Sequence, residues 1–194
     1  KSKREMPLEE DIKKAEKQPE NMFQLFAYLL LYTGCRRGEA LALTWDDIDF
    51  DNNLIYINKQ LQFQSNKPVI ENFTKSKAGI RTVPMLENLR AALLPFKKNS
   101  GYVFSVNRNL LTSKQFRDGW KSLGFSSTPH QFRHAYATTL YNAKIDAKTA
   151  QSLLGHSSVS VTLDVYTHIS RNVANSAKEQ LNNYISQSKI SQKS

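Results

Sequence analysis

Apolar residues recur at helical spacing over most of this chain. In residues 20–33 they include Met22, Phe26 and Leu29, which share one face of a helix, and Gly34 marks its end. The segment before it, residues 1–19, is polar and predicts a linker followed by a short helix. The same spacing predicts further helices in the segments 36–45, 86–96, 113–125, 130–143, 146–155 and 158–166, and an amphipathic helix in the tail, 172–187.

Three shorter segments in the middle of the chain alternate between apolar and polar residues instead. They are residues 53–63, 69–76 and 80–85, and turn signals rich in Asn, Lys, Pro and Gly separate them. This arrangement is typical of a three-stranded antiparallel sheet, and one more short strand is expected in residues 101–105. The predicted fold class is therefore α+β, mainly helical, with one small three-stranded antiparallel sheet.

The charge of the chain points to a polyanionic partner. Lys and Arg outnumber Asp and Glu by 27 to 17, which gives a formal net charge of +10. Such a surface binds nucleic acid by neutralising phosphates and releasing counterions. Ribosomal and membrane-surface proteins share this balance, so charge alone does not choose among these classes.

Composition limits the class of protein further. Hydrophobic residues make up 40 % and charged residues 23 %, as in ordinary soluble domains. The longest apolar stretch, around residues 26–32, is too short to span a bilayer, and the charged N-terminal segment is unlike a signal peptide. The single cysteine, Cys35, excludes an internal disulfide and a cysteine-cluster zinc site, which fits a reducing cytoplasm. Because the chain opens without Met, we expect it to be part of a longer protein.

The first polar constellation, residues 33–39, lies at the tight junction between two predicted helices. Arg36 lies near the start of the second helix, where free N–H groups and the helix dipole favour an anion. Its guanidinium adds a bidentate phosphate donor. The alternative is a helix-capping arginine that pairs with Glu39, three residues further on.

The second constellation is entered through Pro129. A helix that begins there places His130 and Arg133 on one face of its first turn. A metal site is the competing interpretation, because His130 and His134 have i, i+4 spacing, but Gln131 stands where an H-E-x-x-H motif has its glutamate. No carboxylate cluster nearby offers a third ligand, so no metal is expected.

The third constellation joins His156, in the turn after Gly155, to Tyr166 in the next helix. A tyrosine is a weak nucleophile at neutral pH because the pKa of a phenol is about 10. Cationic neighbours would stabilise the phenolate, and a nearby base could accept its proton. The alternative is a half-buried aromatic residue whose hydroxyl contacts water.

Together these constellations resemble the tyrosine recombinases, the lambda-integrase family, and in particular the integrases of phages and of conjugative transposons in Gram-positive bacteria. TGCRRGEALALTWDDID resembles the first arginine box, HQFRHAYATTL the His-x-x-Arg-His box, and LLGHSSVSVTLDVYTH the box that ends at the nucleophilic tyrosine. TKSKAGIRTVPM resembles the β-hairpin that carries the catalytic lysine. The boxes follow the order of the family and cover residues 20–170.

The resemblance assigns roles residue by residue. The catalytic residues that it implies are Arg36, Lys75, His130, Arg133, His156 and the nucleophile Tyr166, with Glu39, His134 and Lys77 in supporting positions. Lys75 is favoured as the general acid. Lys77 stays open as the alternative, because side chains two residues apart point to the same face of a strand.

The implied reaction is a transesterification that uses neither metal nor ATP. Arg36 and Arg133 would bind the non-bridging oxygens of the scissile phosphate, and His130 could accept the proton of Tyr166. Lys75 would protonate the leaving 5′ oxygen, which gives a 3′-phosphotyrosyl link and a free 5′ hydroxyl. Since one phosphodiester replaces another, no cofactor is expected.

The resemblance also implies an organisation and partners. We expect a linker and short helix in residues 1–19, a catalytic domain in residues 20–170 and a tail helix in residues 171–194, docked on its own domain or exchanged between protomers. The implied partners are double-stranded DNA attachment and core sites, further copies of the chain in a homotetramer on that DNA (a monomer in isolation), and host or phage DNA-bending proteins. Rival functions are a type IB topoisomerase, a non-catalytic DNA-binding accessory factor and a metal-dependent nuclease.

Overall fold

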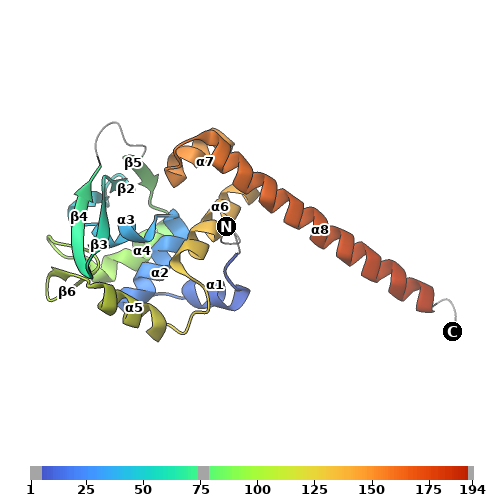
Figure 1. Ribbon diagram of the computed structural model, residues 1–194, viewed down its shortest axis with the longest axis horizontal. Helices are drawn as coiled ribbons and strands as arrows, with labels where there is room; N and C mark the ends of the chain where they lie inside the picture. The colour runs from blue at the N-terminus through green and yellow to red at the C-terminus, as the bar shows by residue number, and fades with distance from the viewer. Residues whose placement is uncertain (1–5, 74–78, 192–194) are drawn as a thin grey trace.

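The computed structural model describes residues 6–73 and 79–191, and helices dominate it (Figure 1). The α-helices are α1 (Glu9–Ala15), α2 (Met22–Thr33), α3 (Arg37–Ala42), α4 (Glu87–Leu93), α5 (Ser113–Ser122), α6 (Pro129–Asn142), α7 (Ala147–Leu154) and α8 (Val159–Ser191), and the 3-10 helices are η1 (Trp45–Asp47) and η2 (Leu94–Phe96). Each segment expected to be helical overlaps one of these elements. The prediction of a mainly helical fold is confirmed.

Helix α2 is the buried helix around which much of the body packs. Its N-terminus is capped by Asn21, whose side chain accepts hydrogen bonds from the N–H groups of Phe23 and Gln24, both at 3.0 Å. It ends at Gly34, which has a φ of 62°. A Cβ on Gly34 would lie 2.3 Å from the ring of Tyr136. Glycine therefore both ends the helix and lets α6 approach, which explains the stop predicted from the sequence.

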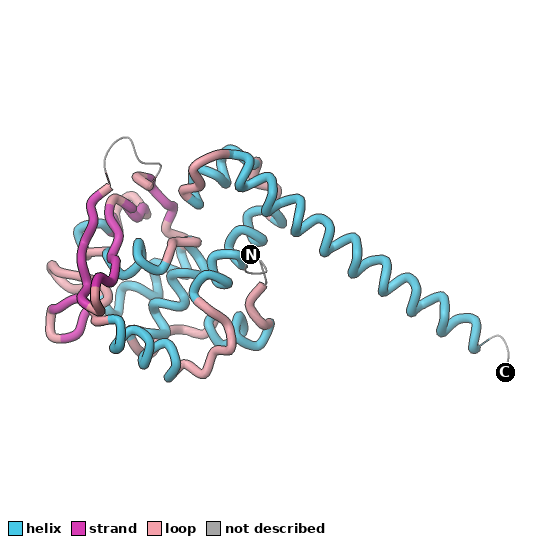
Figure 2. The backbone as a smooth tube through the Cα atoms, in the orientation of Figure 1, coloured by secondary structure: helices cyan, strands magenta, loops and turns pink. Residues whose placement is uncertain are grey.

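The strands form one three-stranded sheet and two hairpins, all antiparallel (Figure 2). The strands are β1 (Ile48–Asp49), β2 (Leu54–Ile57), β3 (Lys59–Gln64), β4 (Lys67–Asn72), β5 (Arg81–Pro84), β6 (Ser105–Val106) and β7 (Asn109–Leu110). The sheet has the order β1-β2-β5, so a three-stranded sheet is present as expected, but with β1 as a member rather than residues 69–76. The strand predicted in residues 101–105 is reduced to an isolated bridge between Tyr102 and Thr44, and β6 begins only at its last residue.

The strand predicted in residues 53–63 divides at Asn58 into β2 and β3, which pair with different strands. The buried carboxylate of Asp47 lies beside the break. It accepts hydrogen bonds from the Asn58 amide at 2.9 Å and from Lys59 Nζ at 2.5 Å. Two consecutive side chains thus turn toward one carboxylate, which is incompatible with the strict alternation of a single strand.

The buried side chains form two separate clusters. The larger is built around α2 and contains edge-to-face aromatic contacts, such as Phe26 against Phe104, whose ring centres are 5.0 Å apart. The smaller joins α6, α7 and α8 through residues that include Tyr136, Leu154 and Val165. Helix α6 contributes to both clusters, so it connects α7 and α8 to the rest of the body.

Helix α8 is the long helix that extends away from the body (Figures 1 and 2). It runs without a break from Val159 to Ser191, whereas the sequence predicts one helix up to Tyr166 and a second helix in the tail. No glycine or proline occurs between these ends, so nothing in the chain stops the first helix. Beyond the body its apolar residues are exposed, with Leu181 at 62 % and Tyr184 at 71 %. Within the described ranges, no helix combines the length and the apolar character needed to cross a membrane.

Candidate active site

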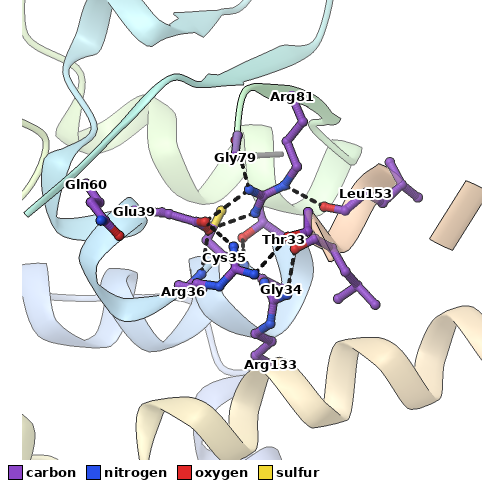
Figure 3. Close-up of polar contacts among 12 residues, drawn as sticks. Thr33, Gly34, Cys35, Arg36, Glu39, Gln60, Gly79, Arg81, Arg133 and Leu153 are labelled. Carbon is purple, nitrogen blue, oxygen red and sulfur yellow. Dashed lines mark hydrogen bonds and ion pairs between the residues drawn. The ribbon is translucent and has the colours of Figure 1, made fainter. Parts of the chain in front are cut away.

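Arg36 is both a helix cap and an accessible cation. As the N-cap of α3 it donates its N–H to Glu39 Oε2 at 2.8 Å, and its Nη1 donates to Glu39 Oε1 at 2.7 Å. Its Nη2 donates to the carbonyl of Gly155 at 2.8 Å (Figure 3). The Arg36 side chain nevertheless remains 43 % exposed, while that of Glu39 is fully buried. The capping interpretation is thus correct, and it leaves part of the guanidinium open to an anion.

Arg81 is a second partner of Glu39, and sequence reasoning missed it. Its Nη2 and Nη1 donate to the two carboxylate oxygens at 2.8 and 3.1 Å, and the side chain is 5 % exposed. Burial alone would raise the pKa of Glu39, but hydrogen bonds and charge from Arg81, then from Arg36, lower it below its usual value. One signal was available. Arg81 lies two residues before buried Val83, so both side chains point to the same, inward face of β5.

Arg133 extends from the first turn of α6 and is buried. It donates from Nη1 to the carbonyl of Gly34 and from Nη2 to that of Leu154, both at 2.6 Å. Burial, followed by the charge of Arg36, lowers the pKa of Arg133 to about 9. The side chain therefore still carries its charge at neutral pH. The helix begins at Pro129, as predicted.

The C-terminal end of α7 joins these arginines to one another. The carbonyls of residues 153–155 accept hydrogen bonds from Arg81, Arg133 and Arg36, in that order along the chain. We call these three arginines with Glu39 the arginine cluster (Figure 3). The carbonyl groups at the C-terminal end of a helix carry partial negative charge, which favours cations there.

Gly155 allows this contact between α7 and the arginine cluster. Its φ is 65°, and a Cβ there would lie 2.7 Å from Arg81 Nη1. The sequence prediction that this glycine ends a helix is confirmed.

His156 follows directly, beside the arginine cluster. Its Nδ1 lies 2.9 Å from Thr162 Oγ1. Burial, then the charges of Arg133 and Arg36, lowers the pKa of His156 to about 4. The imidazole is therefore neutral at pH 7 and acts there as a hydrogen-bonding group rather than as a cation.

Tyr166 lies on α8, and its hydroxyl is bonded elsewhere. It donates to the carbonyl of Ile145 at 3.1 Å, and its ring packs edge-on against Tyr141 with ring centres 5.2 Å apart. Burial and the charge of Asp146 raise the pKa of Tyr166. From the sequence, cationic neighbours that stabilise the phenolate are expected. In this conformation the hydroxyl instead caps a backbone carbonyl and stays protonated.

A hollow of about 470 Å³ opens beside the arginine cluster. Arg36, Arg133 and exposed His130 line it, together with Arg37 and residues of β3. None of its lining residues is an aspartate or glutamate, so the hollow is cationic. We call it the cationic pocket.

The two histidines of α6 lie close together. The rings of His130 and His134 have centres 4.6 Å apart. Within the part of the chain that the structure describes, no three His, Cys, Asp or Glu side chains gather as a set of metal ligands.

Lys75 and Lys77, the two candidates for the general acid, lie outside the described residues. The flanking residues are described and lie together. A Cβ on Gly79 would lie 2.6 Å from the ring of Phe73, and the carbonyl of Gly79 accepts a hydrogen bond from Arg81 Nη1 at 3.4 Å. Gly79 thus lies next to the arginine cluster (Figure 3).

Comparison with known proteins gives consistent matches. A model of the phage integrase family matches residues 8–172. The chain is 31 % identical to a tyrosine recombinase XerC-like protein of Caldanaerobacter subterraneus, over 90 % of this chain and 53 % of that protein. It is 29 % identical to the transposase from transposon Tn916 of Enterococcus faecalis, over 79 % of this chain and 44 % of that protein. The chain therefore spans about half the length of these curated relatives.

Solved structures share the fold. The Tn1549 transposon integrase, in complex with circular intermediate DNA, superposes with a TM-score of 0.71 at 24 % identity, over 91 % of this chain and 67 % of that chain. The catalytic domain of bacteriophage HP1 integrase gives 0.59 at 23 % identity, over 84 % and 87 %. The resemblance inferred from the sequence boxes is confirmed, because the family match covers most of the chain. The chain belongs to the phage integrase family.

Proposed function

We propose that this chain is the catalytic part of a site-specific DNA recombinase that integrates or excises a mobile element through a 3′-phosphotyrosyl intermediate. The observation that carries the proposal is the convergence of Arg36 and Arg133 on one cationic pocket, with His156 beside them. Membership of the phage integrase family supports it. A phosphodiester of double-stranded DNA is the substrate that suits these groups.

Arg36 and Arg133 bind the non-bridging oxygens of the scissile phosphate in this proposal. Both guanidiniums are held before substrate arrives, because each already donates to a backbone carbonyl. Preorganised cations stabilise the charge that develops on phosphorus oxygens without reorganisation during the reaction. Neutral His156 adds a hydrogen bond, and His130, exposed on the first turn of α6, accepts the proton of the nucleophile.

Tyr166 attacks phosphorus in the proposed first step. Its oxygen forms the new bond to the 3′ phosphate while the bond from phosphorus to the 5′ oxygen breaks. The hydroxyl first leaves the carbonyl of Ile145. That exchange costs about 1 kcal/mol, the net value of one ordinary hydrogen bond. In this proposal, DNA binding at the arginine cluster is coupled to a displacement of α8 that frees the hydroxyl and brings it to the phosphate.

Lys75 protonates the leaving 5′ oxygen as the general acid, with Lys77 as the alternative. The support for this assignment is the position of the flanking residues Phe73 and Gly79, beside the arginine cluster. The reaction conserves the number of phosphodiester bonds, so it calls for neither ATP nor another cofactor. Two arginines supply the electrostatic stabilisation that a metal ion supplies in other phosphoryl transfers.

The partners we propose are DNA attachment sites, three further copies of this chain on that DNA, and DNA-bending accessory proteins. The net charge of +10 supports the first. The exposed apolar residues of α8, among them Val173, Leu181 and Tyr184, support contacts between copies. The catalytic domain, residues 20–170, would act in the cytoplasm of a bacterium, on chromosomal or mobile-element DNA.

Covalent trapping on nicked duplexes tests the proposal. The substrate is a pool of duplexes with a randomised core, each carrying a nick one base from the candidate cleavage site. After attack on such a duplex a short fragment diffuses away, which prevents religation. The wild-type chain should give a DNA adduct that survives denaturation, with the DNA on Tyr166 by peptide mapping. Tyr166→Phe should bind the pool equally well and give no adduct. Tyr141→Phe, which alters the ring that packs against Tyr166, should still trap.

The outcomes separate the rival functions. An adduct together with supercoil relaxation and no joined recombinant strands would favour a type IB topoisomerase. Equal DNA binding without any adduct in the full-length protein would favour an accessory factor. Loss of cleavage in EDTA would point to a metal-dependent nuclease and would contradict the proposal.

A further inference from the structure

Arg37 is an exposed arginine held between two aromatic rings. Its Cζ lies 5.8 Å from the ring centre of Phe63, on β3, and 5.5 Å from that of Phe116, on α5. Aromatic faces attract a guanidinium electrostatically and restrict its motion, while the N–H groups at its edge stay available for an acceptor. The charge is thus fixed in place and still able to bind.

Arg37 forms no ion pair with an acidic side chain among the residues that the structure describes. Arg36 and Arg81 share the carboxylate of Glu39, whereas no carboxylate in residues 6–73 or 79–191 pairs with Arg37. The cationic pocket that Arg37 lines holds no carboxylate either. An anion in this pocket would therefore meet Arg37 without competition from an acidic side chain.

Arg36 and Arg37 follow one another in the sequence but contact different parts of the molecule. Arg36 reaches the end of α7 through the carbonyl of Gly155. Arg37 reaches β3 and α5 through its two rings. Both line the same pocket of about 470 Å³. The pocket therefore contains two cations that are anchored by different parts of the molecule.

A DNA strand presents anionic groups in series, with one phosphate for about every 3.4 Å of helix rise. We propose that Arg37 binds the phosphodiester next to the scissile one, while Arg36 and Arg133 bind the scissile phosphate itself. Phe63 and Phe116 position the Arg37 guanidinium for that contact. This inference rests on the proposed function of the pocket and adds a second phosphate site to it.

The competing explanation is that the stem of Arg37 only covers two aromatic rings. Arginine often packs its aliphatic portion on apolar surface while its charged end faces water. Arg37→Met separates the two, because methionine keeps an unbranched apolar stem between the rings and removes the charge. Lys97→Met is the matched control, since Lys97 Nζ also lies over an aromatic ring, 4.5 Å from the centre of Phe50, but outside the cationic pocket.

The first measurement is the salt dependence of DNA affinity for the wild-type chain and both variants, on an intact duplex that contains the trapped site. Each neutralised phosphate contributes about 0.9 to the slope of log K against log salt concentration. Arg37→Met should lower the magnitude of the slope by about this amount and weaken binding about tenfold at low salt. Lys97→Met should leave slope and affinity unchanged. Equal thermal unfolding of both variants and the wild type shows that packing is preserved.

The second measurement places single uncharged methylphosphonates at the phosphates flanking the scissile one. The wild-type chain should lose affinity at one neighbouring position, and Arg37→Met should lose nothing more there. If the affinity losses from Arg37→Met and from the methylphosphonate add at every position, the assignment of Arg37 is wrong. An unchanged salt slope in Arg37→Met would also overturn it. If the wild-type chain fails to trap DNA, the proposed function fails instead. A wild-type chain that traps DNA while Arg37→Met keeps its full slope refutes the second phosphate site alone.

Discussion

The arginine cluster and the surroundings of Tyr166 differ in how firmly the structure holds their reactive groups. In the cluster, Arg36 and Arg81 share the buried carboxylate of Glu39. All three arginines donate to consecutive carbonyls, those of residues 153–155, at the C-terminal end of α7. The Tyr166 hydroxyl makes a single hydrogen bond to a backbone carbonyl, on a half-buried side chain. The groups suited to binding phosphate are built into the fold, whereas the hydroxyl of the proposed nucleophile, Tyr166, is held by one hydrogen bond.

The fold can therefore be complete while the Tyr166 hydroxyl remains unreactive. Burial and Asp146 raise the pKa of Tyr166, so the residue stays a protonated phenol in the free protein. The cluster needs no such restraint, because arginines that bind a phosphate do not by themselves break a bond. In the mechanism proposed above, a DNA-dependent shift of α8 would activate Tyr166 only when its substrate is bound.

Glu39→Gln should have the largest effect on stability. It leaves the buried charge of Arg81 without its carboxylate, and removing one partner of a buried ion pair typically costs about 3 kcal/mol. Urea denaturation at neutral pH measures the free energy of unfolding. The control is Glu87→Gln at the exposed start of α4, which should change little. A loss below about 1 kcal/mol for Glu39→Gln would show that the cluster is not the rigid part of the site.

Gly155→Ala should come next, at about 2 kcal/mol. An alanine there must adopt a φ of 65° and also displace Arg81, whose Nη1 would lie 2.7 Å from the new Cβ. Gly124→Ala is the matched control, because Gly124 has a φ of 64° and no atom within 4 Å of an added Cβ. That variant should lose only about 1 kcal/mol, so the difference reports the contact between α7 and the cluster. Equal losses for the two variants would argue against a tight contact.

His156 should make stability fall in weak acid. Its pKa is about 4 in the fold and about 6.5 in the unfolded chain, so the unfolded state binds more protons between these values. Its contribution is complete above pH 6.5 and is lost as the pH falls toward 4. Because the ring is only partly buried, the loss between pH 7.5 and pH 5 should be about 1 kcal/mol.

Urea denaturation at the two pH values measures this loss. His156→Gln should reduce it, while His168→Gln, on an exposed part of α8, should not. An unchanged pH dependence in His156→Gln would place the responsible group elsewhere.

Tyr166→Phe should have the smallest effect on stability, about 0.5–1 kcal/mol. It removes one hydrogen bond to Ile145 and no buried charge. The comparison with the arginine cluster predicts this small value, even though the same substitution should abolish covalent attachment. A loss above about 2 kcal/mol, measured by urea denaturation, would mean that the hydroxyl is firmly held and not easily released.

Sequence patterns predicted the elements of this fold better than their connections. Gly34 and Gly155 end helices as expected, because the left-handed conformation at each position favours glycine. The break at Asn58 was not predictable, because it depends on Asp47, which lies eleven residues away in a different element. The sequence predicted two helices where α8 is continuous, although no glycine or proline interrupts residues 159–191.

The arrangement of the candidate site was predictable from the sequence only in part. Arg36 and Arg133 converge on one pocket, as the family pattern implies. Arg81 was missed, because a charged residue in a strand is usually assigned to the solvent face, and only the fold brings it to Glu39. The orientation of Tyr166 toward Ile145 is a tertiary contact that no local pattern encodes.

The decisive experiment on Tyr166 is its pH titration in the free protein. Tyrosine labelled with ¹³C at Cζ reports ionisation by NMR, and the signal absent from Tyr166→Phe identifies the residue. We expect a pKa above the ordinary value of about 10, because burial and Asp146 disfavour the phenolate. A pKa below 10 in the absence of DNA would show that the arginines already activate Tyr166. That result would contradict the proposal that Tyr166 becomes reactive only when DNA binds.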